Sequence, residues 1–197
     1  ALRYDLTVPF ARFVVQNRNE ITFPFKRYQM QNVWRADRPQ KGRYREFYQC
    51  DADVIGTDSL LCEVELVQLY DDVFSQLKIP NVDICINNRK LLSGMVELMD
   101  ATNLFSDVVI ALDKLSNIGL KKVKEEMQNK GVKSDSLSIL DTFLNTKNVA
   151  DLSSLLAQSE VGKKGLEELQ FVIDNITKLG LQSVNLVFDI TLARGLD

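Results

Sequence analysis

The 197-residue sequence predicts an α+β fold, in which a mainly antiparallel sheet is flanked by helices and an all-helical subdomain is inserted into it. Two observations carry this prediction. Residues 25–56 alternate polar and apolar side chains with a period of two, on both sides of an arginine-rich loop. Between 105 and 180 this alternation is absent and apolar residues recur at helical spacing, until residues 184–190 alternate again.

The N-terminal third is expected to hold a helix, a hairpin and a second helix. A loop at the start continues as a helix to about Asn17, and Pro24 separates this helix from a β-hairpin over 25–56. A longer helix follows Asp58, a candidate N-cap, and ends before Pro80. Packing against a sheet accounts for the apolar stripe of this helix.

The rest of the chain predicts a discontinuous core domain. Residues 82–87 alternate as a strand and 91–99 fit a short helix; short amphipathic helices then follow, broken at Gly119, Gly131, Asn145 and Gly162. We therefore predict a core domain formed by residues 1–104 and 181–197, with a helical insertion domain at 105–180. The alternative is a helical lid packed on the sheet. Interleaved glutamates favour a solvated face for the insertion's lysines.

The two faces of the predicted hairpin differ in polarity. Gln29 and Gln31 share a face on the first strand, as do Gln49, Asp51 and Asp53 on the second, while the opposite face is largely apolar and is expected to form a core. Arginine forks suit phosphate, and carboxylates two positions apart suit a small cationic ligand. A polar face that merely contacts water is the alternative, because one-sided antiparallel sheets are common.

Composition narrows the possible functions. The net charge of −3 and a pI near 5.2 do not indicate a general nucleic-acid binder. Basic residues nevertheless cluster around the hairpin, and a local cluster of this kind can bind a nucleotide or the end of a tRNA. The basic residues of this cluster are Lys26, Arg27, Arg35, Arg38, Lys41, Arg43 and Arg45.

The cysteine and histidine content also limits the kinds of disulfide, metal site and nucleophile that the sequence can form. Three widely spaced cysteines predict free thiols in a reducing cytoplasm and no metal site. No signal peptide and no membrane-spanning run is present, so no membrane partner is expected. The absence of histidine excludes, within this sequence, a Ser-His or Cys-His nucleophile and a His-ligated metal.

Three separated stretches resemble the histidyl-tRNA synthetases. Residues 34–37 (Trp-Arg-Ala-Asp) with 43–47 (Arg-Tyr-Arg-Glu-Phe) resemble motif 2 of the class II aminoacyl-tRNA synthetases. Residues 2–12 resemble the substrate loop of the histidine-specific enzymes, in the form found in the eukaryotic-like branch, and 192–197 resemble the start of their histidine-specific motif. Three ordered matches along one chain are far more specific than any one of them, and the sequence is identified as a member of this family.

The resemblance implies a class II synthetase sheet and an activity. That activity is the ATP-dependent conversion of histidine to histidyl-adenylate, followed by transfer to tRNA(His), in a cytoplasmic homodimer. ATP is a substrate here and Mg²⁺ is bound mainly through it. Adenylate formation chiefly needs in-line positioning and neutralised phosphate charge, which arginines and Mg²⁺ supply without histidine. Motif 1, motif 3 and the anticodon-binding domain are missing, so the sequence is expected to be an internal piece that is inactive alone.

The resemblance also assigns histidine-binding residues. Asp5 and Thr7 match the acid and hydroxyl that hold the α-amino group, with Gln49 assisting. Asp53 matches the acid that faces the imidazole ring; the alternative is a solvated strand acid. The full set of expected histidine-binding residues is Asp5, Leu6, Thr7, Arg35, Gln49, Asp53 and Arg194.

The nucleotide-binding residues follow from motif 2. Arg35 matches the arginine that contacts the α-phosphate, and Phe47 matches the aromatic side chain that stacks on adenine. Arg43 and Arg45 lie in the loop that contacts ATP and the tRNA end, and the resemblance does not divide these two contacts between them. Arg35 and Arg194 are the expected catalytic residues, although a lone arginine at a strand end is more often in a surface ion pair. At position 37 the class usually has glutamate; Asp37 is expected to accept from the adenine amino group at altered geometry.

Two other functions compete with the ligase. A non-catalytic paralogue, such as a regulatory subunit of ATP phosphoribosyltransferase or an uncharged-tRNA sensor, would be expected to lose catalytic arginines or substrate acids. Asp5, Arg35, Gln49, Asp53 and Arg194 are all present. A plain RNA-binding module is disfavoured because the chain is acidic and the insertion has no basic stripe.

Overall fold

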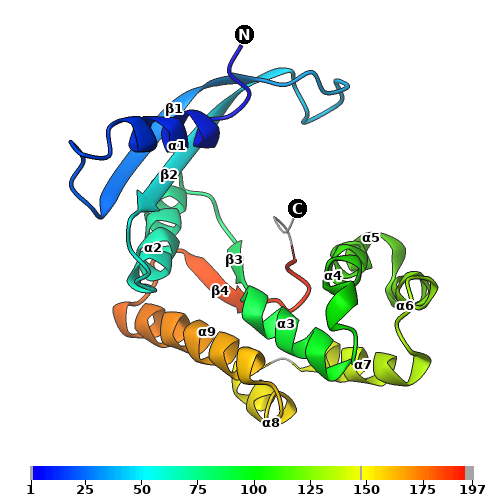
Figure 1. Ribbon diagram of the computed structural model, residues 1–197. Coiled ribbons are helices and arrows are strands. Elements are labelled where there is room, and N and C mark those ends of the chain that lie inside the picture. The colour runs from blue at the N-terminus through cyan, green and yellow to red at the C-terminus, as the bar shows by residue number, and fades with distance from the viewer. Residues whose placement is uncertain (1, 147, 194–197) are drawn as a thin grey trace. The chain divides into compact units, whose positions relative to one another are not determined.

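A computed structural model describes residues 2–146 and 148–193, and the chain divides into two compact units, Ala1–Cys62 and Glu63–Asp197 (Figure 1). The first unit contains α1 (Thr7–Gln16), β1 (Phe25–Trp34) and β2 (Glu46–Ile55). The boundary between the units falls in the first turn of α2 (Leu61–Gln76). The elements that follow α2 are β3 (Val82–Ile86), α3 (Arg89–Leu98), α4 (Phe105–Asp113), α5 (Leu115–Ile118), α6 (Leu120–Asn129), α7 (Leu137–Asn145), α8 (Leu152–Leu155), α9 (Glu160–Leu179) and β4 (Val184–Phe188).

Most of the predicted helices and strands are present, but the expected break at Gly162 is wrong. Helix α9 runs through this glycine without interruption, because Gly162 serves close packing against Gly94 of α3. The strands also do not form one sheet. Within the described residues β1 and β2 make an antiparallel pair, and β3 and β4 make a separate parallel pair. The expectation that the last strand returns to the hairpin's sheet is therefore wrong for this part of the chain. Parallel neighbours need a long crossover, which the helices between β3 and β4 supply.

In the first unit, helix α1 covers the hairpin face that carries the polar residues (Figure 1). The Arg27 guanidinium lies 4.2 Å from the centroid of the Phe10 ring, and the Phe10 and Phe25 rings stack at 6.0 Å. Val33, on the same face, is fully buried.

The opposite hairpin face was expected to form a core, and for the described residues this expectation is wrong. Tyr28, Met30 and Tyr48 are 76%, 62% and 72% exposed. Alternation separates two faces of a strand, but it does not determine which face the neighbouring helix will cover.

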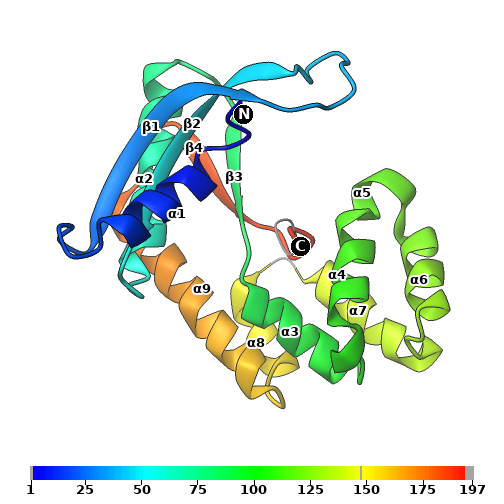
Figure 2. The ribbon, with the colours of Figure 1, turned by 45° about the horizontal axis from the view of Figure 1, so that its top comes forward.

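The second unit has its core between helices. Helices α3 and α9 run side by side (Figure 2). A Cβ added at Gly94 of α3 would lie 2.5 Å from the Gly162 Cα of α9, and one at Gly165 would lie 2.5 Å from the Leu91 nitrogen. Glycine at these positions therefore lets the two helix backbones touch. Glu168 of α9 also accepts hydrogen bonds from Asn88 and Lys90 at the start of α3.

The hydrophobic core continues across residues 104 and 105, where the sequence suggested a domain boundary. Leu91, Leu92 and Met95 of α3 belong to the same buried cluster as the side chains of α4, α6 and α7, and Ile190 joins it from beyond β4. Helix α3 thus packs as part of the helical region. No helix of the described residues is long and apolar enough to cross a bilayer.

A buried acid fixes the start of β4. Asp71 of α2 is 3% exposed, and its carboxylate accepts backbone N–H bonds from Gln182, Ser183 and Val184 at 2.6, 2.9 and 3.1 Å. Burial by itself raises the pKa of Asp71, but these bonds and one from the Ser183 hydroxyl outweigh it and hold the pKa below its usual value. The ionised carboxylate therefore stabilises the fold.

Asp71→Asn is expected to lower the free energy of unfolding by about 2 kcal/mol near neutral pH, because charge-assisted bonds are lost. Since the folded-state pKa is depressed, the carboxylate's contribution is complete above the unfolded-state pKa of about 3.9 and is lost as pH falls through the lower folded value. The gap between wild-type and variant melting temperatures should thus narrow only below about pH 4. Asp72→Asn, at the exposed neighbouring position, is the control and should change the melting temperature little.

Candidate functional site

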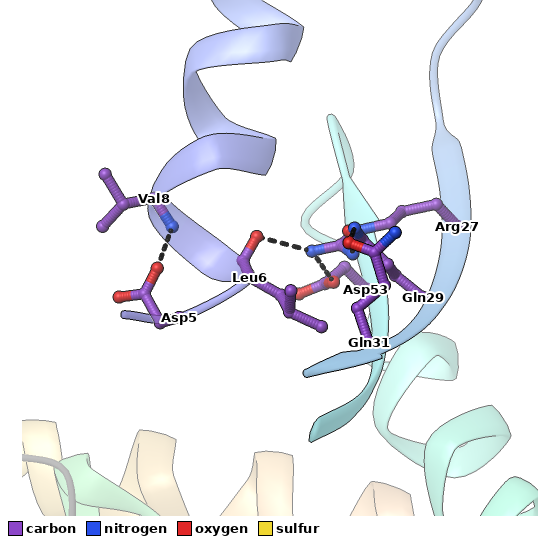
Figure 3. Close-up of polar contacts among 7 residues, drawn as sticks. All are labelled: Asp5, Leu6, Val8, Arg27, Gln29, Gln31 and Asp53. Atoms are coloured by element: carbon purple, nitrogen blue, oxygen red, sulfur yellow. Dashed lines mark hydrogen bonds and ion pairs between the residues drawn. The ribbon is translucent and has the colours of Figure 1, made fainter. Parts of the chain in front are cut away.

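The loop before α1 is bound to the hairpin through its backbone. The Asp5 carboxylate accepts a hydrogen bond from the Val8 nitrogen at 3.1 Å, so it satisfies one of the free N–H groups at the start of α1 (Figure 3). Leu6 is completely buried and its carbonyl accepts a bond from Arg27 Nη2 at 3.1 Å. Thr7 follows with an exposed side chain. Asp5 and Thr7 are therefore held beside the covered face of the hairpin.

Arg27 and Asp53 face each other across the two strands. They are register partners, and Arg27 Nη2 lies 2.8 Å from Asp53 Oδ2 (Figure 3). The contact is an ion pair without hydrogen-bond alignment, since Oδ2 is buried and accepts no hydrogen bond. Arg27 also donates to Gln29 Oε1 at 2.5 Å, and Gln29 Nε2 donates to Gln31 Oε1 at 2.9 Å. A continuous polar row thus runs along β1.

Gln49 contributes a free acceptor to this row. It is the register partner of Gln31, and its Oε1 is buried with no hydrogen-bond partner among the described residues. A buried acceptor without a partner costs free energy, and groups of this kind commonly mark a place that a ligand or water fills. The Gln49 oxygen is therefore suited to a donor such as an ammonium group.

Arg35 lies between two aromatic rings just after the end of β1. Its guanidinium carbon is 4.9 Å from the Tyr4 ring centroid and 5.1 Å from that of Phe47, and its Nε donates to the Tyr4 carbonyl at 3.4 Å. Ring stacking limits the positions that a guanidinium can take while leaving other N–H groups for an anion. Phe47 is on the same strand face as Gln49.

The loop after Arg35 holds its own arginines. Gln40 and Arg43 exchange two backbone hydrogen bonds, with Gly42 at φ 77° between them. Arg43 Nε lies 3.0 Å from the Asp37 carboxylate, and Arg45 Nε donates to the Asp37 carbonyl at 3.1 Å. Asp37 thus contacts the two loop arginines, whereas the sequence suggested that it would face a base.

The first unit brings most of the predicted residues together. Asp5, Leu6, Thr7, Gln49 and Asp53 lie around the covered face of the hairpin. Arg35, Phe47, Asp37, Arg43 and Arg45 lie at its end and in its loop. Arg194 lies outside the described residues. No group of three or more His, Cys, Asp or Glu side chains in the described ranges could hold a metal ion.

Arg27 and Tyr4 are the residues that sequence reasoning left without a role. The sequence places Arg27 in a basic cluster, and the period of two also puts it on the face of Gln29 and Gln31. Its pairing with Asp53 needed the strand register, which the sequence pattern did not supply. Tyr4 carried no signal, because its contact with Arg35 joins two segments that are distant in sequence.

Comparisons with known proteins agree with this arrangement. The family model described as histidyl-tRNA synthetase matches residues 1–197. A histidine–tRNA ligase of Flavobacterium johnsoniae is 57% identical over 202 residues, which cover 100% of this chain and 42% of that protein. One from Porphyromonas gingivalis is 54% identical, over 99% of this chain and 44% of the relative. The chain therefore spans less than half the length of these relatives. Both are bacterial, so they give the expected eukaryotic-like branch no support.

Solved structures show the same fold. A histidyl-tRNA synthetase from Nostoc has a TM-score of 0.89 at 32% identity and covers 100% of this chain and 47% of its own. A Bacillus halodurans protein described as an ATP phosphoribosyltransferase regulatory subunit/histidyl-tRNA synthetase has a TM-score of 0.80, with coverage of 96% and 49%. At 19% identity this second likeness shows the fold alone.

The contacts of Asp37 predict how its loss would act. Asp37→Ala should speed amide hydrogen exchange at residues 41–45 by a few-fold, because Arg43 loses its carboxylate partner while Arg45 keeps the Asp37 carbonyl. The melting temperature should change little, since an exposed ion pair contributes under about 1 kcal/mol. Hydrogen exchange with mass spectrometry measures this, with Lys41→Ala as the exposed control. Unchanged exchange would show that the backbone turn alone orders the loop.

Proposed function

The chain belongs to the histidyl-tRNA synthetase family, and on that premise we propose that it forms the histidine-binding and part of the ATP-binding region of a histidine–tRNA ligase. The reaction joins the histidine carboxylate to the α-phosphorus of ATP and releases pyrophosphate. The histidyl group is then transferred to tRNA(His). The observation that carries the proposal is the row of acceptors from Asp53 to Gln49, which ends beside the ring-stacked Arg35.

The histidine subsite uses both the loop and the hairpin. Asp5, Thr7 and the unpartnered Gln49 oxygen would accept bonds from the α-ammonium group. Asp53 would accept an N–H from the imidazole ring; its Oδ2 is paired with Arg27, and the other oxygen has capacity for the ring. Such pairing discriminates against apolar side chains of the same shape, because the acceptor would be left buried and unsatisfied.

The nucleotide subsite is at the end of the hairpin. Arg35 would contact the α-phosphate, and its contacts with Tyr4 and Phe47 would keep it in place as charge builds up. Phe47 would stack on adenine, while Arg43 and Arg45 would hold the outer phosphates or the tRNA end, with Asp37 positioning them. Mg²⁺ would arrive bound to the ATP phosphates and supply further charge neutralisation. We extend the proposal to Arg194 as a second arginine near the substrate carboxylate.

Partners and location follow from the same premise. We propose a homodimer in the cytoplasm and a helical region inserted between β3 and β4 that holds the acceptor end of tRNA(His). The core that α3 shares with α4, α6 and α7 supports starting this region at α3 rather than at residue 105. A regulatory role without catalysis is not favoured, because such a paralogue would have no need of Asp5, Arg35, Gln49 and Asp53 together.

Substitutions should separate the two subsites in the complete gene product. Arg35→Ala is expected to slow histidine-dependent ATP–pyrophosphate exchange by about a hundredfold, as for other donors to developing phosphate charge. Asp53→Asn should raise the KM for histidine with little effect on that for ATP, because the amide keeps the shape and loses the charge. Arg18→Ala, at an exposed position outside the site, is the control. Normal exchange by Arg35→Ala would leave that arginine with a structural role.

Removing the helical region should separate activation from transfer. A Gly/Ser linker in place of residues 89–180 keeps β3, β4 and the Asp71 contacts at 182–184. Pyrophosphate exchange should stay within a few-fold of wild type, while charging of tRNA(His) should fall by about a hundredfold, because a small misplacement of the acceptor end is costly.

The shorter replacement of 105–180 is the comparison. Both replacements uncover Ile190, but the shorter one also leaves Leu91, Leu92 and Met95 of α3 without their packing partners and should destabilise the protein more. An equal loss of exchange and charging in the longer replacement would instead make the helical region part of the catalytic core.

A further inference from the structure

Arg27 joins the segments that form the proposed histidine subsite. Its side chain is 11% exposed, and its head group contacts the Leu6 carbonyl, Gln29 Oε1 and Asp53 Oδ2. The Phe10 ring of α1 covers the guanidinium at 4.2 Å. One head group thus contacts the substrate loop and both strands (Figure 3), and it also contacts the helix through Phe10.

We propose that Arg27 is a positioning and specificity-determining residue: it fixes Asp53 and makes the subsite select the neutral imidazole ring of histidine over the protonated ring. This inference rests on the proposed function. A lone carboxylate attracts imidazolium by its charge. A carboxylate paired with a guanidinium at 2.8 Å has no net charge to offer a cation, but one oxygen remains to accept an N–H.

Among the described residues of the first unit, Arg27 is the cation that pairs with Asp53. Asp51 shares the strand face with Asp53 and lies opposite Gln29 in the register. Asp5, in the loop, is assigned to the α-ammonium group. Helix α1 has one charged side chain, Arg12, which is exposed and lines a shallow cleft with Val8 and Phe13. Removing the charge of Arg27 would therefore leave Asp51 and Asp53 together, an arrangement that favours a cationic ring.

Wild-type enzyme provides the first test. The dissociation constant of histidine for the complete gene product is measured by calorimetry between pH 5.5 and 8. A free imidazole titrates near pH 6.5, so selection of the neutral ring predicts about tenfold weaker binding at pH 5.5 than at pH 8. Triazolylalanine, whose ring stays neutral throughout this range, is the matched ligand and should bind equally at both ends. Tighter histidine binding at low pH would overturn the proposal whatever the variants do.

Substitution of Arg27 provides the second test. Arg27→Met keeps an unbranched apolar stem under Phe10 and removes the charge, and Arg12→Met is the control of identical chemistry on the exposed side of α1. At pH 8 Arg27→Met should raise the histidine KM in pyrophosphate exchange about tenfold or more while the ATP KM stays within a few-fold. Its histidine affinity should rise, not fall, toward pH 5.5. Arg27→Lys, which retains a cation, should restore the wild-type direction of the pH profile.

The outcomes distinguish a failure of the proposed ligase function from a failure of the role proposed for Arg27. If the wild-type gene product shows no histidine-dependent exchange, the proposed function is wrong. If exchange is present and Arg27→Met keeps the wild-type pH profile, Arg27 does not select the ring's charge state. A variant with equal losses for histidine and ATP and an unchanged profile would make Arg27 a packing residue, which also contradicts the proposal.

Discussion

The Arg27 guanidinium is the contact through which the loop before α1, the two strands of the hairpin and the helix itself are held together. Without it, the Leu6 carbonyl would keep only its bond from the Phe10 nitrogen, and Asp53 would be an uncompensated carboxylate 26% exposed in its side chain. Breaking a largely buried ion pair usually costs more than the pair itself contributes, because one charge stays behind. The same contact therefore maintains the local fold and the electrostatic character of the proposed histidine subsite.

The arrangement also accounts for two different environments along one strand face. Near α1 the row of Arg27, Gln29 and Asp53 is covered, and polar groups there pair with one another. Toward the other end, Arg35 is held by aromatic rings and the loop arginines are exposed. A covered end suits selection of a small ring by hydrogen bonds, while an open arginine-rich end suits phosphates and a macromolecular substrate. In the proposed function, distance along the hairpin would thus separate recognition of histidine from the transfer chemistry.

Sequence periodicity predicted much of this architecture and failed where tertiary partners decided the outcome. The period of two placed Gln49 and Asp53 on one face, and the prolines marked the start of the hairpin and the end of α2. The capping signal at Asp58 was wrong, because α2 begins at Leu61 and the Leu61 nitrogen donates to the Ser59 hydroxyl. Periodicity could not show that α1 would cover the polar face, leaving Tyr28 and Met30 exposed, because both faces satisfied the strand pattern. Nor could it pair β3 with β4, since the long helical connection hides their relation. The role of Arg27 follows from the strand register, which the sequence pattern does not determine.

The backbone contact between α3 and α9 has a mechanical consequence. Helix α3 follows β3 after two residues, and α9 leads into β4 through Gly180, so two short connections join the helical region to the paired strands. The close approach of Gly94 and Gly162 couples these two connections. Asp71 binds one of them at 182–184, and Asn87, in the other, donates to the carbonyls of Ile190 and Leu192. Because Ile86, Phe188 and Ile190 also pack against the helical core, a displacement of the strands would be transmitted to α3 and α9 together.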